Sequence, residues 1–213
     1  MIKAVIFDLD GVITNTDKLH YKAWKKLADR LEIPFDEKAN ESLKGISRME
    51  SLLLILGNRA SDYTKDELEA LASDKNAIYN SLIEAITPSW VLPGIIRFLE
   101  QLRNHHIKTA VFSSSRNASH IIELLGIRDL FDLVETGNEI EYSKPDCQGY
   151  LRICFLLRIP PAYCVMIDDS QSGIDGANYS GMKTIGIGTG LKNADVVLQS
   201  SDKLQFCLLE DIC

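Results

Sequence analysis

The chain has 213 residues, enough for one medium-sized domain or for a core domain that carries a small insertion. Hydrophobic residues make up 46% and charged residues 25%, which are globular averages and argue against long disordered stretches. The net charge of −7 argues against a nucleic-acid partner, because a phosphate backbone needs a basic face, but it leaves room for small phosphorylated metabolites.

The cysteines and the apolar stretches set further limits on the class of protein. The five cysteines include no close Cys-x-x-Cys pair, so neither a disulfide framework nor a zinc site is indicated, and a reducing cytoplasm fits best. No signal-peptide pattern opens the sequence, and no apolar segment approaches the length of a membrane span. We therefore expect a cytoplasmic protein with no membrane partner.

The first expected element is a strand over residues 2–9, because a nearly continuous apolar run is typical of a strand buried on both faces of a parallel sheet. The segment 14–90 then reads as nearly all helix. Its first helix has one apolar stripe at four-residue spacing, formed by Leu19, Ala23, Leu27 and Leu31. A second helix is indicated by Leu52, Ile55 and Leu56. A third is expected over 67–86, with a capping-box pattern at its start formed by Thr64 and Glu67.

After Pro88 and Pro93-Gly94, short strands alternate with helical patterns. The strands are expected at 107–112, 133–135, 163–167 and 184–187, and the helices around 95–102, 121–125 and 150–157. This alternation predicts an α/β core with a Rossmann-like parallel sheet, formed by 1–13 and 91–213, with residues 14–90 inserted as a helical cap. Ligands of such sheets bind at the carboxyl ends of the strands.

Two aspartates stand at the end of the first expected strand, in Asp8-Leu9-Asp10-Gly11. Their two-residue spacing puts both carboxylates on one side of an extended chain, and Gly11 allows a sharp turn. Paired carboxylates serve as a hard-cation site or as a nucleophile beside a general acid/base. The motif alone is as compatible with a solvated loop or a calcium loop.

Three further polar segments each follow an expected strand. Residues 113–117, Ser-Ser-Ser-Arg-Asn, open a helix with hydroxyls and a cation where a phosphate could bind. Lys144 lies before another helix, whose entry Pro145 is expected to pre-set. Asp168 and Asp169 end a further strand. Taken singly, these segments are as well explained by a helix cap, a solvated lysine and a surface acidic pair.

Together and in this order, the segments resemble the four motifs of the haloacid dehalogenase superfamily over essentially the whole chain. Those motifs are Asp-x-Asp-x-Thr/Val, a Ser or Thr, a Lys, and an acidic pair. Further segments resemble the β-phosphoglucomutase group of that superfamily: 10–16, His20, Trp24, 40–48, Lys75-Asn76 and 113–117. The chain departs from that group in having Asn15 where Asp is usual and Asp168 where Glu is usual.

The resemblance implies Mg²⁺-dependent phosphoryl transfer. Asp8 would form an aspartyl phosphate, and Asp10 would pass a proton to or from a sugar hydroxyl. Ser113 and Lys144 would stabilise the phosphate charge. The implied metal ligands are Asp8, the backbone carbonyl of Asp10, Asp169, and Asp168 either directly or through water.

The resemblance also implies roles for residues of the expected cap. Thr16 and His20 would lie beside Asp10 and position its side chain, and Trp24 is expected to pack in the cap. Arg48 would bind the phosphate that is not transferred. The full set of implied substrate-binding residues is Lys44, Gly45, Ile46, Ser47, Arg48, Lys75, Ser115, Arg116 and Asn117.

The reaction implied by the resemblance interconverts β-glucose 1-phosphate and glucose 6-phosphate through a bisphosphate. The expected partner is therefore a small sugar phosphate, bound by a monomer. A sugar-phosphate phosphatase of the same fold is the runner-up, with water as the acceptor. A catalytically silent phosphate-binding protein is the third reading, which the intact set of Asp8, Asp10, Lys144 and Asp169 disfavours.

Overall fold

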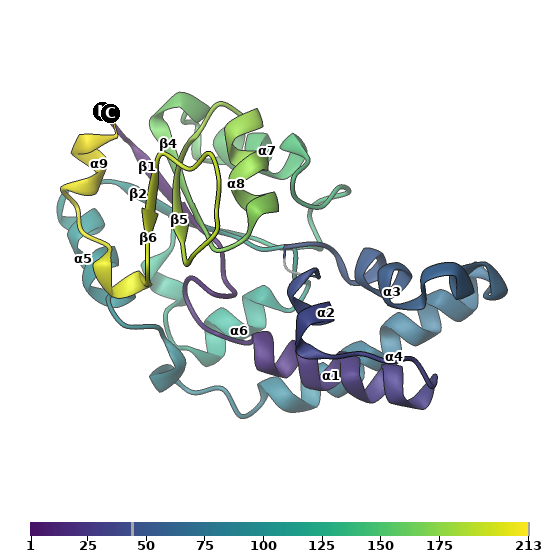
Figure 1. The fold of residues 1–213 in the computed structure, drawn as a ribbon. Helices are drawn as coiled ribbons and strands as arrows, with labels where there is room; N and C mark the ends of the chain where they lie inside the picture. The colour runs from purple at the N-terminus through teal and green to yellow at the C-terminus, as the bar shows by residue number, and fades with distance from the viewer. Residues whose placement is uncertain (44, 213) are drawn as a thin grey trace. The chain divides into compact units, whose positions relative to one another are not determined.

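The computed structural model describes residues 1–43 and 45–212, which form two compact units (Figure 1). The first, here called the core unit, comprises Met1–Asn15 and Ile86–Cys213. The second, here called the helical unit, comprises Thr16–Ala85. No helix in the described part of the chain combines the length and the apolar character needed to span a membrane.

A six-stranded parallel sheet forms the centre of the core unit as far as the structure describes it. Its strand order is β3-β2-β1-β4-β5-β6. The chain therefore builds outward from β1 in one direction and then, from β4, in the other, which is the doubly wound α/β arrangement. The strands are β1 (Ala4–Phe7), β2 (Lys108–Phe112), β3 (Leu133–Glu135), β4 (Cys164–Asp168), β5 (Lys183–Ile187) and β6 (Val196–Leu198).

The expected α/β class is confirmed, with differences in detail. The first strand is shorter than the predicted 2–9, since regular pairing covers only Ala4–Phe7. The short strand β6 was not predicted; its Val-Val-Leu run stands between the polar residues Asp195 and Gln199. All four residues of β1 are buried, as the continuous apolar run indicated.

Helices cover both faces of this sheet. Figure 1 shows α7 (Cys147–Leu157) and α8 (Gln171–Tyr179) on one side, and α5 (Ile95–Asn104) and α9 (Leu208–Asp211) on the other. The remaining α-helix of the unit is α6 (Ala118–Leu124). Pro145 does not begin α7 as expected, because Asp146 is its N-cap and accepts a hydrogen bond from the Gln148 N–H at 2.8 Å. Single turns of 3₁₀ helix occur at Pro88–Trp90, Arg128–Leu130, Pro161–Tyr163 and Ser201–Lys203.

The helical unit packs its helices around a core of its own. The helices are α1 (Asp17–Arg30), α2 (Glu37–Glu41), α3 (Arg48–Leu56) and α4 (Lys65–Ile83), with a 3₁₀ segment at Gly57–Asp62. Three residues of the predicted stripe, Leu19, Ala23 and Leu27, are buried, while Leu31 lies just past the end of α1. The short α2 was not predicted. The core is formed by Trp24, Leu27, Ala28, Phe35, Leu43, Leu52, Leu56 and Ala72.

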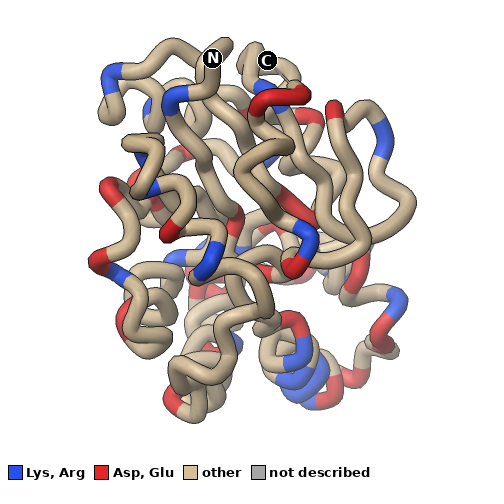
Figure 2. The backbone as a smooth tube through the Cα atoms, turned by 90° about the vertical axis from the view of Figure 1, so that its left-hand side faces the viewer, with Lys and Arg blue, Asp and Glu red and all other residues tan. Residues whose placement is uncertain are grey.

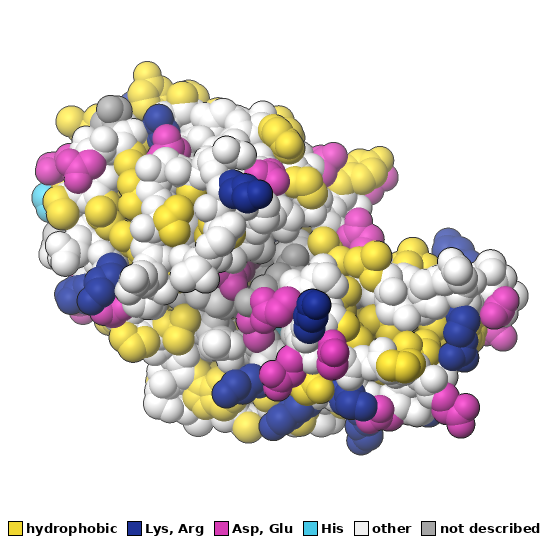
Figure 3. Space-filling model, viewed as in Figure 1, with side chains coloured by type: hydrophobic (Ala, Val, Ile, Leu, Met, Phe, Trp, Pro, Cys, Tyr) yellow, Lys and Arg dark blue, Asp and Glu magenta, His cyan; other side chains and the backbone are white. Residues whose placement is uncertain are grey.

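Charged residues of both signs are interspersed along the backbone (Figure 2), and acidic and basic side chains lie side by side on the face shown in Figure 3. In the helical unit, the exposed Arg30 and Asp74 approach to 2.6 Å. Exposed pairs of this kind contribute about 1 kcal/mol or less. The stability of the unit therefore depends mainly on its apolar core and on the ends of its helices.

The predicted capping box at the start of α4 is confirmed. The Thr64 hydroxyl accepts from the Glu67 N–H at 3.4 Å, and the Glu67 carboxylate accepts from the Thr64 N–H at 2.7 Å. These bonds satisfy two of the N-terminal backbone groups that the helix itself leaves without partners.

We predict that Thr64→Ala lowers the free energy of unfolding by about 1 kcal/mol, because one first-turn N–H loses its acceptor. Chemical denaturation followed by circular dichroism measures this. Ser73→Ala is the matched control, an exposed position inside the same helix. It should leave stability unchanged or slightly raised, since alanine has the higher helix propensity. Equal losses in both variants would contradict a capping role for Thr64.

Candidate active site

The site lies at the carboxyl ends of β1, β2 and β4. Phe7 pairs with Val111 on one side and Ile167 on the other, so the residues that follow, Asp8, Phe112 and Asp168, leave the sheet at the same edge. The Asp8 N–H donates to the Ile167 carbonyl at 2.9 Å, which fixes Asp8 beside β4. Between β1 and β4 the direction of strand addition reverses, and such a switch point is where doubly wound sheets bind ligands.

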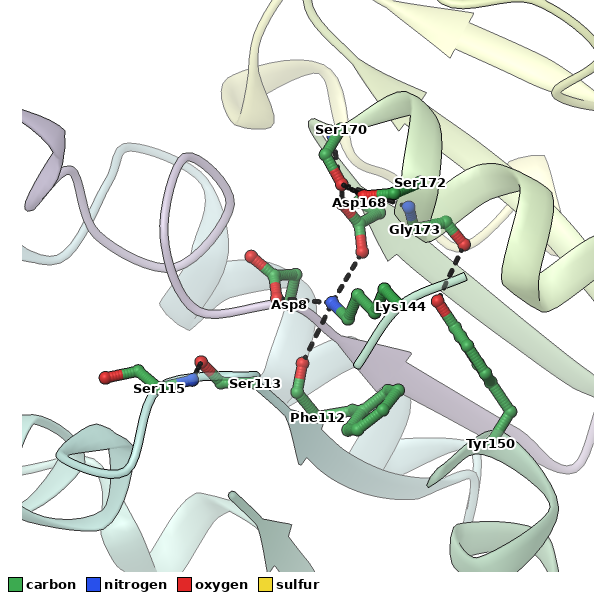
Figure 4. Close-up of polar contacts among 10 residues, drawn as sticks. All are labelled: Asp8, Phe112, Ser113, Ser115, Lys144, Tyr150, Asp168, Ser170, Ser172 and Gly173. Carbon is green, nitrogen blue, oxygen red and sulfur yellow. Dashed lines mark hydrogen bonds and ion pairs between the residues drawn. The ribbon is translucent and has the colours of Figure 1, made fainter. Parts of the chain in front are cut away.

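A buried lysine joins two of the predicted acidic residues. The Lys144 Nζ atom lies 2.6 Å from Asp8 Oδ1 and 2.7 Å from Asp168 Oδ2 (Figure 4). It also donates to the Phe112 carbonyl at 3.2 Å. Lys144 is 2% exposed and Asp8 is 7% exposed, so water screens these charges poorly. This geometry fits the site lysine that the resemblance implies and not the alternative reading, a solvated side chain.

The pKa values of Asp8 and Lys144 are both raised, which favours the neutral form of the acid and the charged form of the lysine. Burial raises the pKa of Asp8 to about 7, with Lys144 opposing the shift and Asp168 adding to it. Burial also disfavours the charged form of Lys144, but the attraction of Asp168 and Asp8 outweighs it and holds the Lys144 pKa above its ordinary value. The lysine thus stays protonated, while Asp8 is held close to the point at which it ionises.

The acidic pair after β4 is held by the start of α8. Asp168 Oδ1 accepts from the Ser170 N–H at 2.9 Å and from the Ser170 Oγ–H at 2.7 Å. Ser170 Oγ in turn accepts from the Gly173 N–H at 3.0 Å, which caps the helix. A Cβ atom on Gly173 would lie 1.9 Å from Asp168 Oδ2, so only glycine allows this approach.

Asp169 lies against the turn that follows Asp8. In that turn the Gly11 N–H donates to the Thr14 carbonyl at 2.7 Å, and the half-buried Asp10 lies directly before it. Gly11 has a φ of +79°, and an added Cβ atom would lie 2.2 Å from Asp169 Oδ2. Glycine therefore serves both the backbone conformation and the close approach of the carboxylate.

Three carboxylates could hold a metal ion. Asp8, Asp168 and Asp169 each offer an oxygen, and these oxygens all lie within 4.8 Å of one another. Carboxylate oxygens are the ligands that hard cations such as Mg²⁺ prefer. The Asp10 carboxylate does not belong to this group. The family resemblance implies its backbone carbonyl as a ligand instead.

The serine-rich turn after β2 is ordered by its own hydroxyls. Ser113 is buried, and its Oγ accepts from the Ser115 N–H at 3.1 Å. Ser115 Oγ accepts from the Asn117 N–H at 3.2 Å, just before α6 begins. The Arg116 side chain is exposed, and its carbonyl accepts from Asn138 Nδ2 at 3.0 Å.

The predicted cap residues lie in the helical unit, where several form one contact network. Lys75 is only 3% exposed, and its Nζ atom lies 3.0 Å from His20 Nδ1. The same ammonium lies over the rings of Trp24 and Tyr79, at 4.6 and 4.7 Å from their centroids. The Tyr79 hydroxyl donates to Thr16 Oγ1 at 3.2 Å. Trp24 packs in the core as expected, and the sequence did not show that it also contacts Lys75.

Electrostatics keep His20 neutral. Burial, then the charge of Lys75, then that of Arg48, hold the pKa of His20 well below its ordinary value. A neutral imidazole can accept the Lys75 proton at Nδ1, which places its own proton on Nε2. His20 is thus an ordered hydrogen-bonding group rather than a surface histidine.

The remaining cap residues lie at the start of α3. Ser47 is its N-cap, and with Glu50 it forms a capping box. Arg48 and Ile46 are half-buried, and Gly45 has a φ of +76°. Lys44 lies outside the described residues. Sequence reasoning treated Ser47 only as a substrate-binding residue, although its spacing from Glu50 is the same capping signal as at Thr64.

Two site residues were missed by sequence reasoning. Phe112 contributes a carbonyl to Lys144, and its ring lies beneath the ammonium. Tyr150, in α7, is fully buried and donates its hydroxyl proton to the Gly173 carbonyl at 2.9 Å. In the sequence Phe112 ends an apolar run and Tyr150 belongs to a helical pattern, so neither is distinguished from an ordinary core residue.

Comparisons with known proteins show which family this chain resembles over its length. Residues 2–181 match the family model of haloacid dehalogenase-like hydrolases. The chain is 43% identical to a beta-phosphoglucomutase of Bacillus subtilis (strain 168), covering 99% of this chain and 95% of that protein. It is 26% identical to a phosphorylated carbohydrates phosphatase of Thermotoga maritima, over 93% of this chain and 91% of that protein. The crystal structure of a beta-phosphoglucomutase from Clostridium difficile superimposes with a TM-score of 0.96 at 41% identity. The match covers 99% of this chain and 96% of that chain.

The resemblance inferred from the sequence is thereby confirmed. The family model spans most of the chain, and the residues of its expected motifs, Asp8, Lys144 and Asp168, meet at one edge of the sheet. The chain belongs to the haloacid dehalogenase-like hydrolase family and is an enzyme of phosphoryl transfer.

Proposed function

We propose that this enzyme interconverts β-glucose 1-phosphate and glucose 6-phosphate through a glucose 1,6-bisphosphate intermediate. The observation that carries the proposal is the 43% identity to the Bacillus subtilis beta-phosphoglucomutase over nearly the full length of both chains. A sugar-phosphate phosphatase is the second candidate. The similarity to the Thermotoga maritima phosphatase favours it, but at 26% identity that relative is more distant.

Asp8 is the proposed nucleophile. One of its carboxylate oxygens attacks one phosphorus of the bound glucose 1,6-bisphosphate, an acyl-phosphate bond forms, and the bond from that phosphorus to the sugar oxygen breaks, so that a glucose monophosphate leaves. The 6-hydroxyl of the next β-glucose 1-phosphate then attacks the acyl phosphate, which frees Asp8 and forms the bisphosphate again. The pKa of about 7 means that Asp8 is only partly ionised by itself near neutrality. A cation bound beside it would favour the reactive anion.

Mg²⁺ is the proposed cofactor, and the residues present fit it. The three carboxylates Asp8, Asp168 and Asp169 bring more negative charge together than Lys144 offsets, and their oxygens are close enough to share one ion. We propose Asp8, Asp169 and the Asp10 carbonyl as ligands. Both oxygens of Asp168 already accept hydrogen bonds from Lys144 and Ser170, which supports contact through water for this residue. When bound, Mg²⁺ would offset the repulsion between carboxylate and phosphate.

Three residues of the core unit are proposed to act on the reacting groups beside Asp8. Asp10 gives a proton to the departing sugar oxygen and takes one from the attacking hydroxyl in the reverse transfer. Lys144 supplies a fixed positive charge, and Ser113 supplies a hydroxyl donor for a phosphate oxygen. Proton transfer and charge stabilisation are then separate tasks of separate side chains. Thr16 and His20, in the helical unit, are proposed to assist the proton transfer.

Recognition of the sugar and of its second phosphate is proposed for residues of both units. Arg48 is the main candidate for the second phosphate, because a guanidinium stays charged and can bind two phosphate oxygens at once. The complete proposed set is Lys44, Gly45, Ile46, Ser47, Arg48, Lys75, Ser115, Arg116 and Asn117. We propose the core and helical units as catalytic and substrate-recognition domains of a monomer.

The first prediction concerns the nucleophile and the product. Purified enzyme with Mg²⁺, β-glucose 1-phosphate and a trace of glucose 1,6-bisphosphate should yield glucose 6-phosphate well in excess of free phosphate, each measured separately. Asp8→Asn should abolish both products while leaving the fold intact, because an amide cannot form the acyl phosphate. The exposed Asp129→Asn is the control and should retain activity. Free phosphate as the main wild-type product would establish the phosphatase instead.

The second prediction separates the roles of two aspartates. Asp10→Ala should slow turnover by on the order of a hundredfold or more through loss of proton transfer, with little change in Mg²⁺ affinity. Asp169→Ala should weaken Mg²⁺ binding, and chelation of the metal should stop the wild-type reaction until Mg²⁺ is restored. Titration calorimetry with Mg²⁺ alone measures the affinities. Equal weakening of Mg²⁺ binding in both variants would show that these roles are misassigned.

The third prediction concerns the second phosphate. Arg48→Ala should lower kcat/KM for β-glucose 1-phosphate by roughly tenfold to 150-fold, the loss of about 1.5–3 kcal/mol expected for a charged hydrogen bond. Transfer from acetyl phosphate, which has no second phosphate or sugar, should be unaffected. Arg30→Ala, an exposed arginine of the same unit paired with Asp74, is the control and should match wild type with both donors. A loss of equal size with both donors in Arg48→Ala would argue against the assignment.

A further inference from the structure

All three protons of the Lys144 ammonium have an acceptor within the core unit. The acceptors are Asp8 Oδ1 at 2.6 Å, Asp168 Oδ2 at 2.7 Å and the Phe112 carbonyl at 3.2 Å. An ammonium has three N–H groups and no others to give. When a phosphate oxygen arrives beside Asp8, Lys144 can bind it only by turning one of these N–H groups away from its present acceptor. Hydrogen bonds alone therefore do not fix the position of Nζ during the reaction.

The Phe112 ring offers a contact that does not depend on those protons. Nζ lies 4.9 Å from the ring centroid, within the range of a cation–π interaction. The attraction comes from the negative face of the ring and uses no N–H group, so it persists when a hydrogen bond is redirected. Lys144 is 2% exposed and Phe112 is fully buried, and exclusion of water strengthens the interaction.

The ring itself packs beside Tyr150 (Figure 4). Tyr150 meets it edge to face, with centroids 4.8 Å apart and planes at 82°. The Tyr150 hydroxyl is tied to the Gly173 carbonyl at 2.9 Å. Gly149 lies so close that a Cβ atom would come within 2.3 Å of Phe112 Cζ. These contacts with two residues of α7 limit how far the Phe112 ring can move.

We propose that Phe112 is a positioning residue for phosphoryl transfer: its ring holds the Lys144 ammonium in place while one N–H is redirected to the transferred phosphoryl group. This inference rests on the role proposed above for Lys144. It assigns to an apolar core residue an electrostatic function that acts through the lysine.

The test reduces the negative charge on the face of the Phe112 ring with little change in the shape of the ring. Phe112 is replaced by phenylalanine analogues with one, two and three ring fluorines, which progressively withdraw charge from the ring face. The rate constant for phosphorylation of Asp8 by acetyl phosphate should fall stepwise, by about tenfold in all, while KM changes much less. A core residue with only a packing role would not give this graded loss, and the melting temperature should remain close to that of wild type.

The matched control is the same fluorine series at Phe98. This ring, in α5, is fully buried and meets Phe7 edge to face at 6.0 Å. Among the described residues, every lysine found over an aromatic ring lies over a ring other than that of Phe98. The Phe98 series should therefore leave the rate constant unchanged. A flat series at Phe112, or the same decline at both positions, would overturn the proposal.

Acetyl phosphate keeps this test separate from the proposed function. It reports phosphorylation of Asp8 without a sugar, so an enzyme that makes no glucose 6-phosphate can still show the graded loss. That result would refute the mutase assignment and leave the role of Phe112 standing. A wild-type enzyme that acetyl phosphate does not phosphorylate would overturn both.

Discussion

The ion pairs of Lys144 determine how the rest of the site can be arranged. Asp8 and Asp168 leave neighbouring strands at the same edge, so two carboxylates are forced together in a place from which water is largely excluded. A buried charge without a partner is costly, and loss of one member of such a group strongly destabilises the rest. Burial raises the pKa of Asp8 to about 7, although the neighbouring charge of Lys144 opposes the shift. With Asp169 nearby, three carboxylates surround one ammonium, and this arrangement suits the site to a cation.

The sheet order explains why these residues meet. Because strands are added on one side of β1 up to β3 and on the other side from β4, the loops after β1 and β4 diverge and leave space at the sheet edge. Lys144 lies in the connection between β3 and α7, well past the end of the strand, yet its long side chain reaches the same edge. Two glycines complete the arrangement: Gly11 admits Asp169, and Gly173 admits Asp168. The geometry of the site is therefore a property of the α/β fold, refined by a few residues that have no side chain.

The parts of the molecule that the sequence predicted are those that depend on local pattern. The apolar strands, the long helices, the capping box at Thr64 and the acidic motifs are all signalled within a few residues. The contacts of Lys144 are not, since Asp8 lies 136 positions away and their meeting depends on strand register and helix placement. The same holds for Lys75 and His20, 55 positions apart. The short elements α2 and β6 were missed. The first is a mostly polar segment of five residues, and the second has only three apolar residues, so neither has a clear hydrophobic pattern.

The side chain of Ser170 connects Asp168 to the N-terminal end of α8. Its one hydroxyl donates to Asp168 and accepts from the first turn of α8. Together with the hydrogen bond from the Ser170 N–H, this hydroxyl connects the Asp168 carboxylate to the first turn of the helix. A glutamate at position 168 would carry its carboxylate one methylene further from the backbone, so the hydrogen bonds from Ser170 would have to form anew. The reach of the acid at position 168 and the anchoring of α8 are therefore linked in this chain.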